Sequence, residues 1–202
     1  YSRDSGVELA IDTHPRNGKG RRVGVLGLGT GTLAAYGEPG DLYKYYELNP
    51  VIIDLANGRG GYFSFLRDSR ADVEVIPGDA RISLEAETRA GLVNDYDILV
   101  LDAFSSDSVP VHLVTSDAFE VYLQNLAPAG VIAVHITNVR LALRPVLWQL
   151  AQTYRMGFAV IENPAASDRP DVFSSTWVLL AREPGLLELP ALAARAGDDL
   201  NF

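Results

Sequence analysis

A length of 202 residues, with 48% hydrophobic and 21% charged residues, suits one soluble globular domain with a full hydrophobic core better than two. The net charge of −9 argues against nucleic acid as a partner, because phosphate binding relies on Lys- and Arg-rich surfaces that this chain lacks. The sequence has no cysteine and no apolar run of the ~18 to 20 residues that a membrane span needs, which excludes disulfides, cysteine-based metal sites and a membrane span in this chain.

Short runs of apolar, often β-branched residues alternate with helical segments, as in a parallel sheet with crossover helices. We therefore predict an α/β fold with a Rossmann-like, mostly parallel sheet of seven strands and helices on both faces. The expected strands are residues 22–26, 42–48, 72–76, 96–101, 131–136, 158–162 and 176–181. The expected helices are residues 32–36, 50–57, 80–90, 117–126 and 143–154. The last two strands look like an antiparallel closing pair.

The same pattern sets the expected domain limits. Residues 23–182 are predicted to form one Rossmann-like domain. Residues 1–22 lead into it, and residues 6–12 are expected to pair as an extra strand, the remnant of an amino-terminal hairpin. Residues 183–202 are expected to form a peripheral carboxyl-terminal tail.

A glycine-rich turn, GLGTG at residues 27–31, lies between the first strand and the first helix. Glycines in this position let the backbone approach a ligand closely. A dinucleotide fingerprint has the spacing G-x-G-x-x-G, whereas this turn reads G-x-G-x-G. The spacing favours a nucleoside sulfonium over a dinucleotide and makes Gly27, Gly29, Thr30 and Gly31 candidate cofactor-binding residues. A purely structural tight turn is the alternative.

Acidic residues follow the second and third strands. Glu47 ends the second strand, 16 residues beyond Gly31, where a carboxylate can accept hydrogen bonds from both ribose hydroxyls. Asp79 follows the third strand at the same edge of the sheet, where it can meet the exocyclic amine of adenine, with Ala80 beside it. The glycine turn after the first strand, Glu47 after the second and Asp79 after the third are therefore expected to converge on one adenosine-containing ligand. For Glu47, the alternative is a solvated acid at a strand end.

Two more carboxylates, Asp102 and Asp107, follow the fourth strand at the edge where open α/β sheets hold their substrates, and they are the catalytic candidates. Asp102 is also a candidate cofactor-binding residue. Alkyl transfer from a sulfonium to an amine requires the amine, with a reference pKa near ~10.4, to lose a proton before its lone pair can attack. One carboxylate can accept this proton, and a second can hold the far ammonium of a diamine. The alternatives are a cap of the adjacent loop for Asp102 and a surface acid for Asp107.

Five motifs in this order, GLGTG, YELNP, GDAR, YDILVLDAFSSD and PAGVIAVHITN, resemble the spermidine synthase family, particularly its bacterial spermidine synthase-like branch. The match covers residues 23–138, with weaker support from residues 177–180. The resemblance implies a class I methyltransferase fold with an antiparallel final strand, and the transfer of an aminopropyl group from decarboxylated S-adenosylmethionine to a polyamine such as putrescine, with release of methylthioadenosine. It assigns the ribose-binding acid to Glu47, the adenine-contacting acid to Asp79 and the proton acceptor to Asp102. Relatives are often dimers, but no isolated apolar stripe in this sequence marks an interface, so the resemblance leaves a homodimer open as one alternative.

The chain departs from the family pattern in three respects, one of which is that the family's amino-terminal β-hairpins are absent or reduced to residues 1–12. Thr30 stands where the family usually carries an aspartate that grips the aminopropyl ammonium, and Asp107 lies five residues after Asp102 instead of three. The neutral hydroxyl of Thr30 keeps a second hypothesis open, a methyltransferase or other alkyl transferase on the same fold that uses S-adenosylmethionine itself. A non-catalytic nucleoside-binding domain is the third hypothesis.

The remaining candidates concern metals, the cavity wall and location. His14, His112 and His135 are too scattered to suggest a metal site, so no metal is assigned and each is expected to be structural or at the surface. Phe104 and Ser105 follow the fourth strand and are expected to form part of the wall around the ligand. A chain without cysteine is compatible with the cytoplasm, either as an independent protein or as the soluble part of a membrane-associated one.

Overall fold

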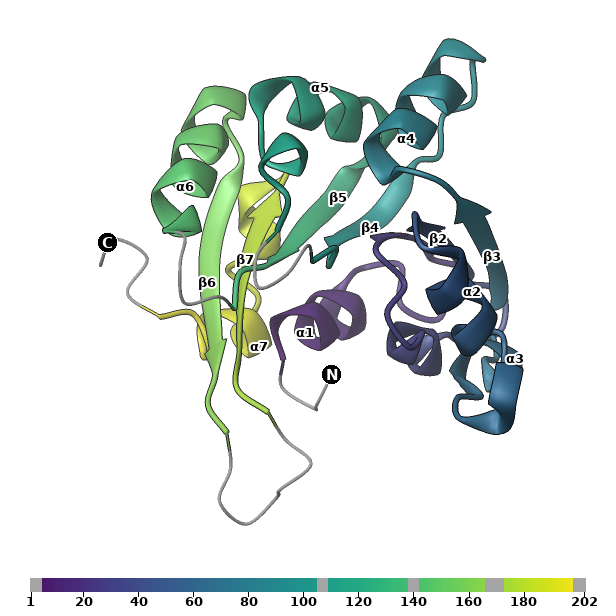
Figure 1. The fold of residues 1–202 in the computed structure, drawn as a ribbon. Helices are drawn as coiled ribbons and strands as arrows, with labels where there is room; N and C mark the ends of the chain where they lie inside the picture. The colour runs from purple at the N-terminus through teal and green to yellow at the C-terminus, as the bar shows by residue number, and fades with distance from the viewer. Residues whose placement is uncertain (1–4, 105–108, 138–141, 166–172, 198–202) are drawn as a thin grey trace.

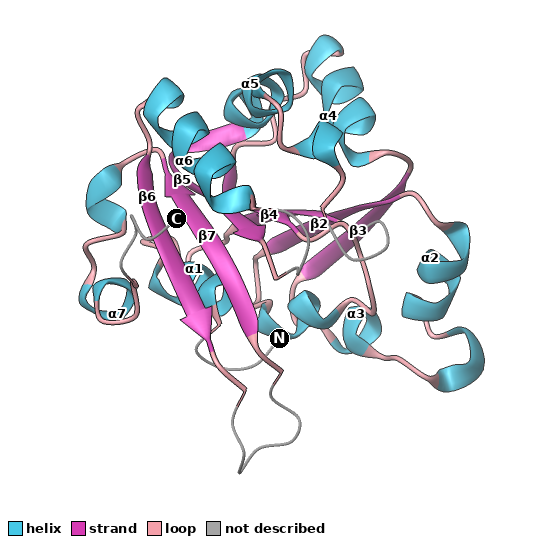
Figure 2. Ribbon diagram, turned by 60° about the vertical axis from the view of Figure 1, so that its left-hand side comes forward, coloured by secondary structure: helices cyan, strands magenta, loops and turns pink. Residues whose placement is uncertain are grey.

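Seven strands form one sheet in the order β3-β2-β1-β4-β5-β7-β6 (Figure 1 and Figure 2). The computed structural model describes residues 5–104, 109–137, 142–165 and 173–197. Strands β1 to β5 pair in parallel, and β7 lies antiparallel between β5 and β6. This arrangement confirms the predicted mostly parallel sheet. The strands are β1 (Arg22–Leu26), β2 (Leu42–Glu47), β3 (Asp72–Pro77), β4 (Tyr96–Leu101), β5 (Leu126–His135), β6 (Gly157–Asn163) and β7 (Ser175–Ala181).

Helices cover both faces of the sheet, as predicted. One hydrophobic cluster joins α4, α5 and α6 to one face, and a second joins α1, η1, α2 and α7 to the other. Figure 1 shows α4, α5 and α6 together along the upper side of the molecule. Among the described residues, no helix combines the length and the apolar character that crossing a membrane requires. The helices are α1 (Gly6–Thr13), η1 (Thr32–Tyr36), α2 (Pro50–Ala56), η2 (Arg59–Gly61), α3 (Phe65–Asp68), α4 (Ala80–Arg89), η3 (Val111–Leu113), α5 (Ser116–Asn125), α6 (Leu143–Tyr154), η4 (Pro184–Leu186) and α7 (Pro190–Ala193).

Strand β4 lies at the centre of the sheet, and all six of its residues are buried. Leu99 and Leu101 belong to the cluster that contains α4 to α6, whereas Ile98 and Val100 belong to the cluster on the other face. This alternation follows from the two-residue period of a strand. Because both faces are covered, the strand reads as one continuous apolar run. Asp102 comes next and leaves the core at the carboxyl edge of the sheet.

The prediction of an extra strand at residues 6–12 is wrong, because this segment forms helix α1. Ser5 caps the helix, since its hydroxyl oxygen accepts a hydrogen bond from the N–H of Glu8, and the Ser-x-x-Glu spacing is a helix-start signal that the strand prediction overlooked. Val7, Ala10 and Ile11 follow the helical period and are buried. Helix α1 packs against β7 and β5 rather than extending the sheet.

The described part of the segment after β7, residues 183–197, is not peripheral, which corrects for these residues the prediction of a peripheral tail over residues 183–202. Leu187 and Leu192 are only 8% and 3% exposed and belong to the same hydrophobic cluster as α1. Ala196 forms an antiparallel bridge with Ile161 of β6. The sequence after Arg182 therefore completes the core on the face that α1 covers. Residues 198–202 lie outside the described part of the chain.

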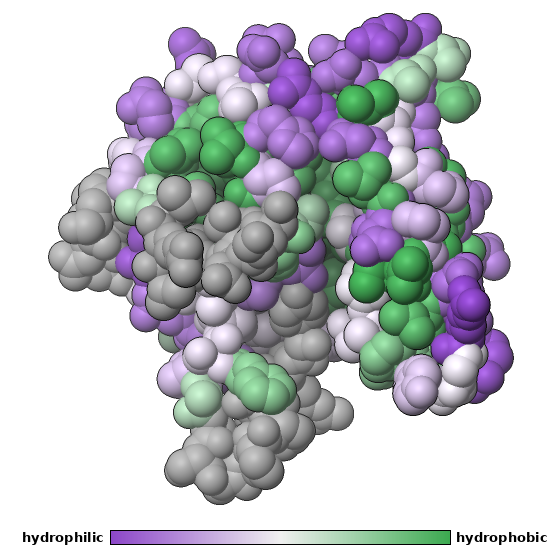
Figure 3. All heavy atoms as spheres, in the orientation of Figure 1, coloured by the Kyte–Doolittle hydropathy of each residue, from purple (hydrophilic) through white to green (hydrophobic). Residues whose placement is uncertain are grey.

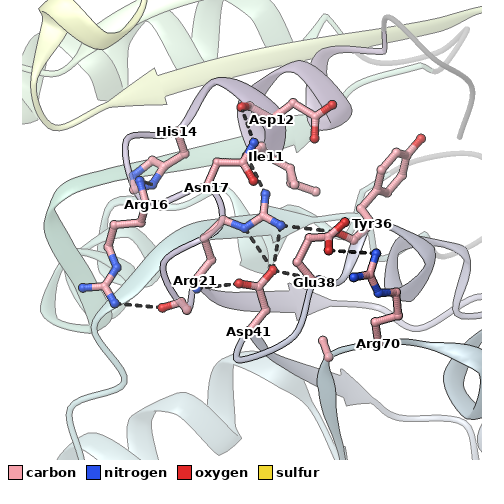
Figure 4. Close-up of polar contacts among 12 residues, drawn as sticks. Ile11, Asp12, His14, Arg16, Asn17, Arg21, Tyr36, Glu38, Asp41 and Arg70 are labelled. Atoms are coloured by element: carbon pink, nitrogen blue, oxygen red, sulfur yellow. Dashed lines mark hydrogen bonds and ion pairs between the residues drawn. The ribbon is translucent and has the colours of Figure 1, made fainter.

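A buried ion pair ties the start of β1 to two neighbouring helices (Figure 4). The side chains of Arg21 and Asp41 are 1% and 0% exposed, and Nη2 of Arg21 lies 2.6 Å from Oδ2 of Asp41. The same guanidinium donates to the carbonyl oxygen of Ile11 near the end of α1 and to that of Tyr36 in η1. One side chain therefore connects the sheet to α1 and to the helix that follows the glycine turn.

Candidate functional site

A cavity of about 590 Å³ opens where β1, β2, β3 and β4 end. Small-molecule sites typically have volumes of about 300 to 1,000 Å³. Two apolar side chains that line the cavity are also open to solvent, because Leu48 is 70% exposed and Phe104 is 40% exposed. Figure 3 shows hydrophobic side chains gathered on the surface over α2. The predicted site residues that line the cavity are Gly27, Gly29, Glu47, Asp79, Ala80 and Asp102.

The other predicted residues have different positions. Thr30 and Gly31 belong to the same turn but are not part of the cavity lining. Phe104 lines the cavity as predicted. Asp107 and Ser105 lie outside the residues that the structure describes.

The three glycines of the turn have different structural tasks, although all have positive φ angles, of 99°, 53° and 80°. A Cβ on Gly27 would lie 2.5 Å from the carbonyl oxygen of Asp102, so glycine lets the loops after β1 and β4 meet. A Cβ on Gly31 would lie 2.6 Å from a methyl carbon of Leu66 in α3. A Cβ on Gly29 would have no neighbour within 4 Å. Gly29 is therefore the glycine with open space around it, as close approach of a ligand requires.

Glu47 joins the ends of β1 and β2. One of its carboxylate oxygens accepts a hydrogen bond from the N–H of Leu28, at 3.0 Å, and the other accepts from the N–H of Asn49, at 2.8 Å. These bonds fix the carboxylate at the cavity wall between the glycine turn and the start of α2. The side chain is thus pre-positioned for a ligand that approaches the turn.

Asp79 caps α4 and faces a histidine. Its Oδ1 accepts a hydrogen bond from the N–H of Ile82, which satisfies one of the free donors in the first turn of the helix. Its Oδ2 lies 3.3 Å from Nε2 of His112. His112 also lines the cavity, although its sequence context gave no indication of a site role. This contact could not be predicted from the sequence, because the two residues are 33 positions apart and meet only where η3 packs beside the start of α4.

Asp102 pairs with His135, a residue that sequence reasoning assigned to the scaffold. The Oδ1 atom of Asp102 lies 2.8 Å from Nδ1 of His135, and the two side chains are 15% and 12% exposed. The sequence did contain a signal for a site role of His135, because this residue ends β5 and β5 is the parallel neighbour of β4. The carboxyl ends of adjacent parallel strands meet at one edge, so a polar residue there belongs on the list of candidates.

Tyr45 lies near this pair on β2, and its hydroxyl is not available as a base. Burial raises the pKa of the Tyr45 hydroxyl well above its usual value, and the hydroxyl of Tyr43 and the carboxylate of Asp102 raise it further. The phenol therefore stays protonated and neutral. In the described ranges, no three His, Asp or Glu side chains form a group that could hold a metal ion.

Two curated relatives match the chain in sequence, and no family model matches it. A probable polyamine aminopropyl transferase of Bifidobacterium longum is 28% identical over 169 residues, which cover 80% of this chain and 33% of the relative. A polyamine aminopropyltransferase of Vibrio vulnificus is 34% identical over 120 residues, which cover 57% of this chain and 38% of the relative. The chain therefore spans little more than a third of the length of these relatives.

Solved structures of low sequence identity share the fold. A spermidine synthase of Thermotoga maritima has a TM-score of 0.64 at 12% identity and covers 89% of this chain and 59% of its own. A spermidine synthase in complex with the transition-state analogue AdoDATO has a TM-score of 0.61 at 13% identity, with coverages of 89% and 58%. Human methyltransferase-like protein 13 in complex with SAH has a TM-score of 0.63 at 19% identity, with coverages of 98% and 91%. These neighbours confirm the predicted class I methyltransferase-like fold.

Proposed function

We propose that this chain, which is spermidine synthase-like in sequence and methyltransferase-like in fold, transfers an aminopropyl group from decarboxylated S-adenosylmethionine to a polyamine such as putrescine and releases methylthioadenosine. The observation that carries the proposal is the convergence of Glu47, Asp79 and Asp102 on one cavity of about 590 Å³. Both the sulfonium donor and the amine acceptor are cations. A chain with a net charge of −9 and three carboxylates at its cavity suits them.

Glu47 and Asp79 are proposed to hold the nucleoside. Each oxygen of Glu47 accepts one backbone N–H and retains lone-pair capacity for a ribose hydroxyl. The Oδ1 atom of Asp79 caps α4, so the adenine amine is assigned to Oδ2, the oxygen that faces His112. Gly29 provides the open backbone beside which the adenosyl group would lie. The AdoDATO and SAH complexes of the structural neighbours support a nucleoside of this kind.

Asp102 is proposed to accept a proton from the acceptor amine. The nitrogen lone pair then forms a bond to the carbon of the aminopropyl group that is attached to sulfur, and the bond between that carbon and sulfur breaks. Its electron pair stays on sulfur, which becomes the neutral thioether of methylthioadenosine. The acid–base work that this reaction requires is the removal of one proton, and the position of Asp102 on the cavity wall after the buried strand β4 supports its assignment to this task.

The proposed function is tested by incubating the protein with decarboxylated S-adenosylmethionine and putrescine and measuring methylthioadenosine by chromatography. We expect methylthioadenosine and an aminopropylated diamine to accumulate in equal amounts. Tight binding of the donor without turnover would instead identify a nucleoside-binding domain. Methylation of the amine from S-adenosylmethionine would identify a methyltransferase, and either outcome would overturn the proposal.

Thr30 is the specific observation that favours methyl transfer as a second candidate. Its neutral hydroxyl cannot supply the negative charge that would balance the ammonium of a decarboxylated donor. The structural similarity to a methyltransferase-like protein in complex with SAH is also consistent with this candidate. Calorimetric titration with both donors separates the two candidates, because stronger binding of the carboxylated donor supports methyl transfer and stronger binding of the decarboxylated donor supports aminopropyl transfer.

Replacement of Glu47 by glutamine should weaken methylthioadenosine binding by about 10- to 100-fold, since hydrogen bonds to a charged group contribute about 1.5 to 3 kcal/mol. The amide keeps the shape of the side chain but loses the charge and one acceptor, so a ribose hydroxyl and one of the backbone N–H groups of Leu28 and Asn49 lose their partner. Calorimetry measures the dissociation constant. Glu74→Gln is the matched control, because Glu74 is exposed on the edge strand β3 and does not line the cavity. Equal weakening in both variants, or in neither, would remove Glu47 from the nucleoside site.

A further inference from the structure

The imidazole of His112 is directed at a carboxylate of the cavity wall. Both His112 and Asp79 line the cavity, and Nε2 of His112 lies 3.3 Å from Oδ2 of Asp79. A carboxylate only accepts hydrogen bonds, so the ring nitrogen in this contact is one that carries a proton. The side chain of His112 is 52% exposed, so burial in the hydrophobic core does not account for its orientation. The contact with the carboxylate accounts for it.

The backbone that carries this imidazole is held from two helices. The carbonyl oxygen of His112 accepts a hydrogen bond from Nη1 of Arg81, at 3.2 Å. The guanidinium of Arg81 is itself paired with Glu85, one turn further along α4, at 3.0 Å. The carbonyl oxygen of Leu113, which is 3% exposed, accepts a hydrogen bond from the hydroxyl of Tyr122 in α5, at 3.0 Å. The imidazole therefore extends from a segment that is fixed to both α4 and α5.

The two carboxylate oxygens of Asp79 have different partners. Oδ1 accepts a hydrogen bond from the N–H of Ile82, at 3.0 Å, and Oδ2 faces His112. Two points of attachment fix the plane of the carboxylate. Each carboxylate oxygen has two lone-pair sites, so Oδ2 keeps one of them after the imidazole has donated. The side chain of Asp79 is 25% exposed and forms part of the cavity wall, so a ligand in the cavity can reach this remaining acceptor.

We propose that His112 positions Asp79 and thereby sets the preference of the site for adenine over a 6-oxopurine. The proposal rests on the proposed function and deepens it, because it says how the base of the nucleoside is selected. The exocyclic amine of adenine can donate a hydrogen bond to Oδ2 of Asp79. A 6-oxopurine such as hypoxanthine has a carbonyl oxygen in the same place, so two acceptors face each other with no proton between them. Sites built around a specific hydrogen bond reject analogues that cannot form it.

This selection depends on a carboxylate that cannot turn away from the base. Without the imidazole, Asp79 is held only through Oδ1, and Oδ2 can rotate toward solvent. The wall then no longer presents a fixed acceptor to the group at carbon 6 of the purine. Binding sites keep their geometry through supporting hydrogen bonds of this kind, made to the residues that touch the ligand. His112 is thus a positioning residue, and Asp79 is the residue that contacts the base.

The test measures by calorimetry the dissociation constants of methylthioadenosine and of methylthioinosine, its counterpart with oxygen in place of the exocyclic amine. We expect the wild type to bind methylthioadenosine about 10²-fold more tightly, because a hydrogen bond to a charged group is lost in the second nucleoside. His112→Ala should reduce this preference about tenfold, because the alanine holds Oδ2 of Asp79 no longer. His112→Gln should restore most of the preference, because the glutamine amide also donates a hydrogen bond.

The matched control is Val111→Ala, because Val111 precedes His112 in η3, is 66% exposed and does not line the cavity. This variant should bind both nucleosides as the wild type does. Equal weakening of both nucleosides in His112→Ala would make its contact with Asp79 a structural tie between η3 and α4 and overturn the proposal. A His112→Gln protein that behaves like His112→Ala would overturn it too. Absence of methylthioadenosine binding by the wild type would instead overturn the nucleoside site of the proposed function.

Discussion

Replacement of Asp102 by asparagine should lower the rate of methylthioadenosine release by about 10²- to 10⁴-fold, the usual range for loss of a general base. The amide has nearly the same shape as the carboxylate. Its oxygen can still accept a hydrogen bond from Nδ1 of His135, which lies 2.8 Å from Oδ1 of Asp102 in the wild type. It cannot take up the proton of the attacking amine. Chemistry should therefore be lost while the nucleoside still binds, and single-turnover rates with saturating donor, together with calorimetry of methylthioadenosine, separate the two effects.

Asp97→Asn is the control for this experiment. Asp97 lies on the same strand and is 3% exposed, but it is near the opposite end of β4, where its carboxylate accepts a hydrogen bond from the N–H of Arg22. We expect this variant to turn over at the wild-type rate once folding has been verified. An Asp102→Asn protein that retains the wild-type rate would exclude the proton-accepting role. Loss of methylthioadenosine binding in that variant would assign Asp102 to the nucleoside site instead.

Most of the sheet could be predicted from the sequence because each strand and turn carries its own local signal. Strand β4 is a run of apolar residues with the length of a strand, and its observed bounds match the prediction. Pro50 occupies the first turn of α2 after the capping residue Asn49, again a signal within a few residues. Since parallel strands share one carboxyl edge, placing the strands also placed Glu47, Asp79 and Asp102 around one cavity.

The features that the sequence prediction missed depend mainly on contacts between distant segments, although both His135 and helix α1 also carried a local signal. His135 is 33 residues from its partner Asp102, and its stacking partner Trp177 comes from a third strand. Helix α1 carried a local start signal at Ser5, but its few apolar residues are also compatible with a strand, and its packing against β7 and β5 is a long-range contact. For this site, every polar residue at the carboxyl end of a parallel strand is therefore a candidate site residue, including His135, which the sequence analysis assigned a structural role.

Replacement of Arg21 by methionine should lower the free energy of unfolding by about 3 to 5 kcal/mol, the usual cost of removing one member of a buried ion pair. Methionine keeps much of the side-chain volume, but the carboxylate of Asp41, which is 0% exposed, loses its cation. The carbonyl oxygens of Ile11 and Tyr36 lose their donor as well. Urea unfolding followed by tryptophan fluorescence measures the change.

Arg59→Met is the matched control, because Arg59 and Asp54 form an ion pair of similar length, 2.7 Å, with side chains that are 74% and 53% exposed. Exposed pairs contribute about 0 to 1 kcal/mol, so this variant should unfold almost as the wild type does. The double variant Arg21→Met/Asp41→Asn should recover part of the loss, since a neutral amide needs no cation and can still accept the N–H of residue 21. If Arg21→Met costs no more than Arg59→Met, apolar packing alone holds α1 and the helix after the glycine turn against the sheet.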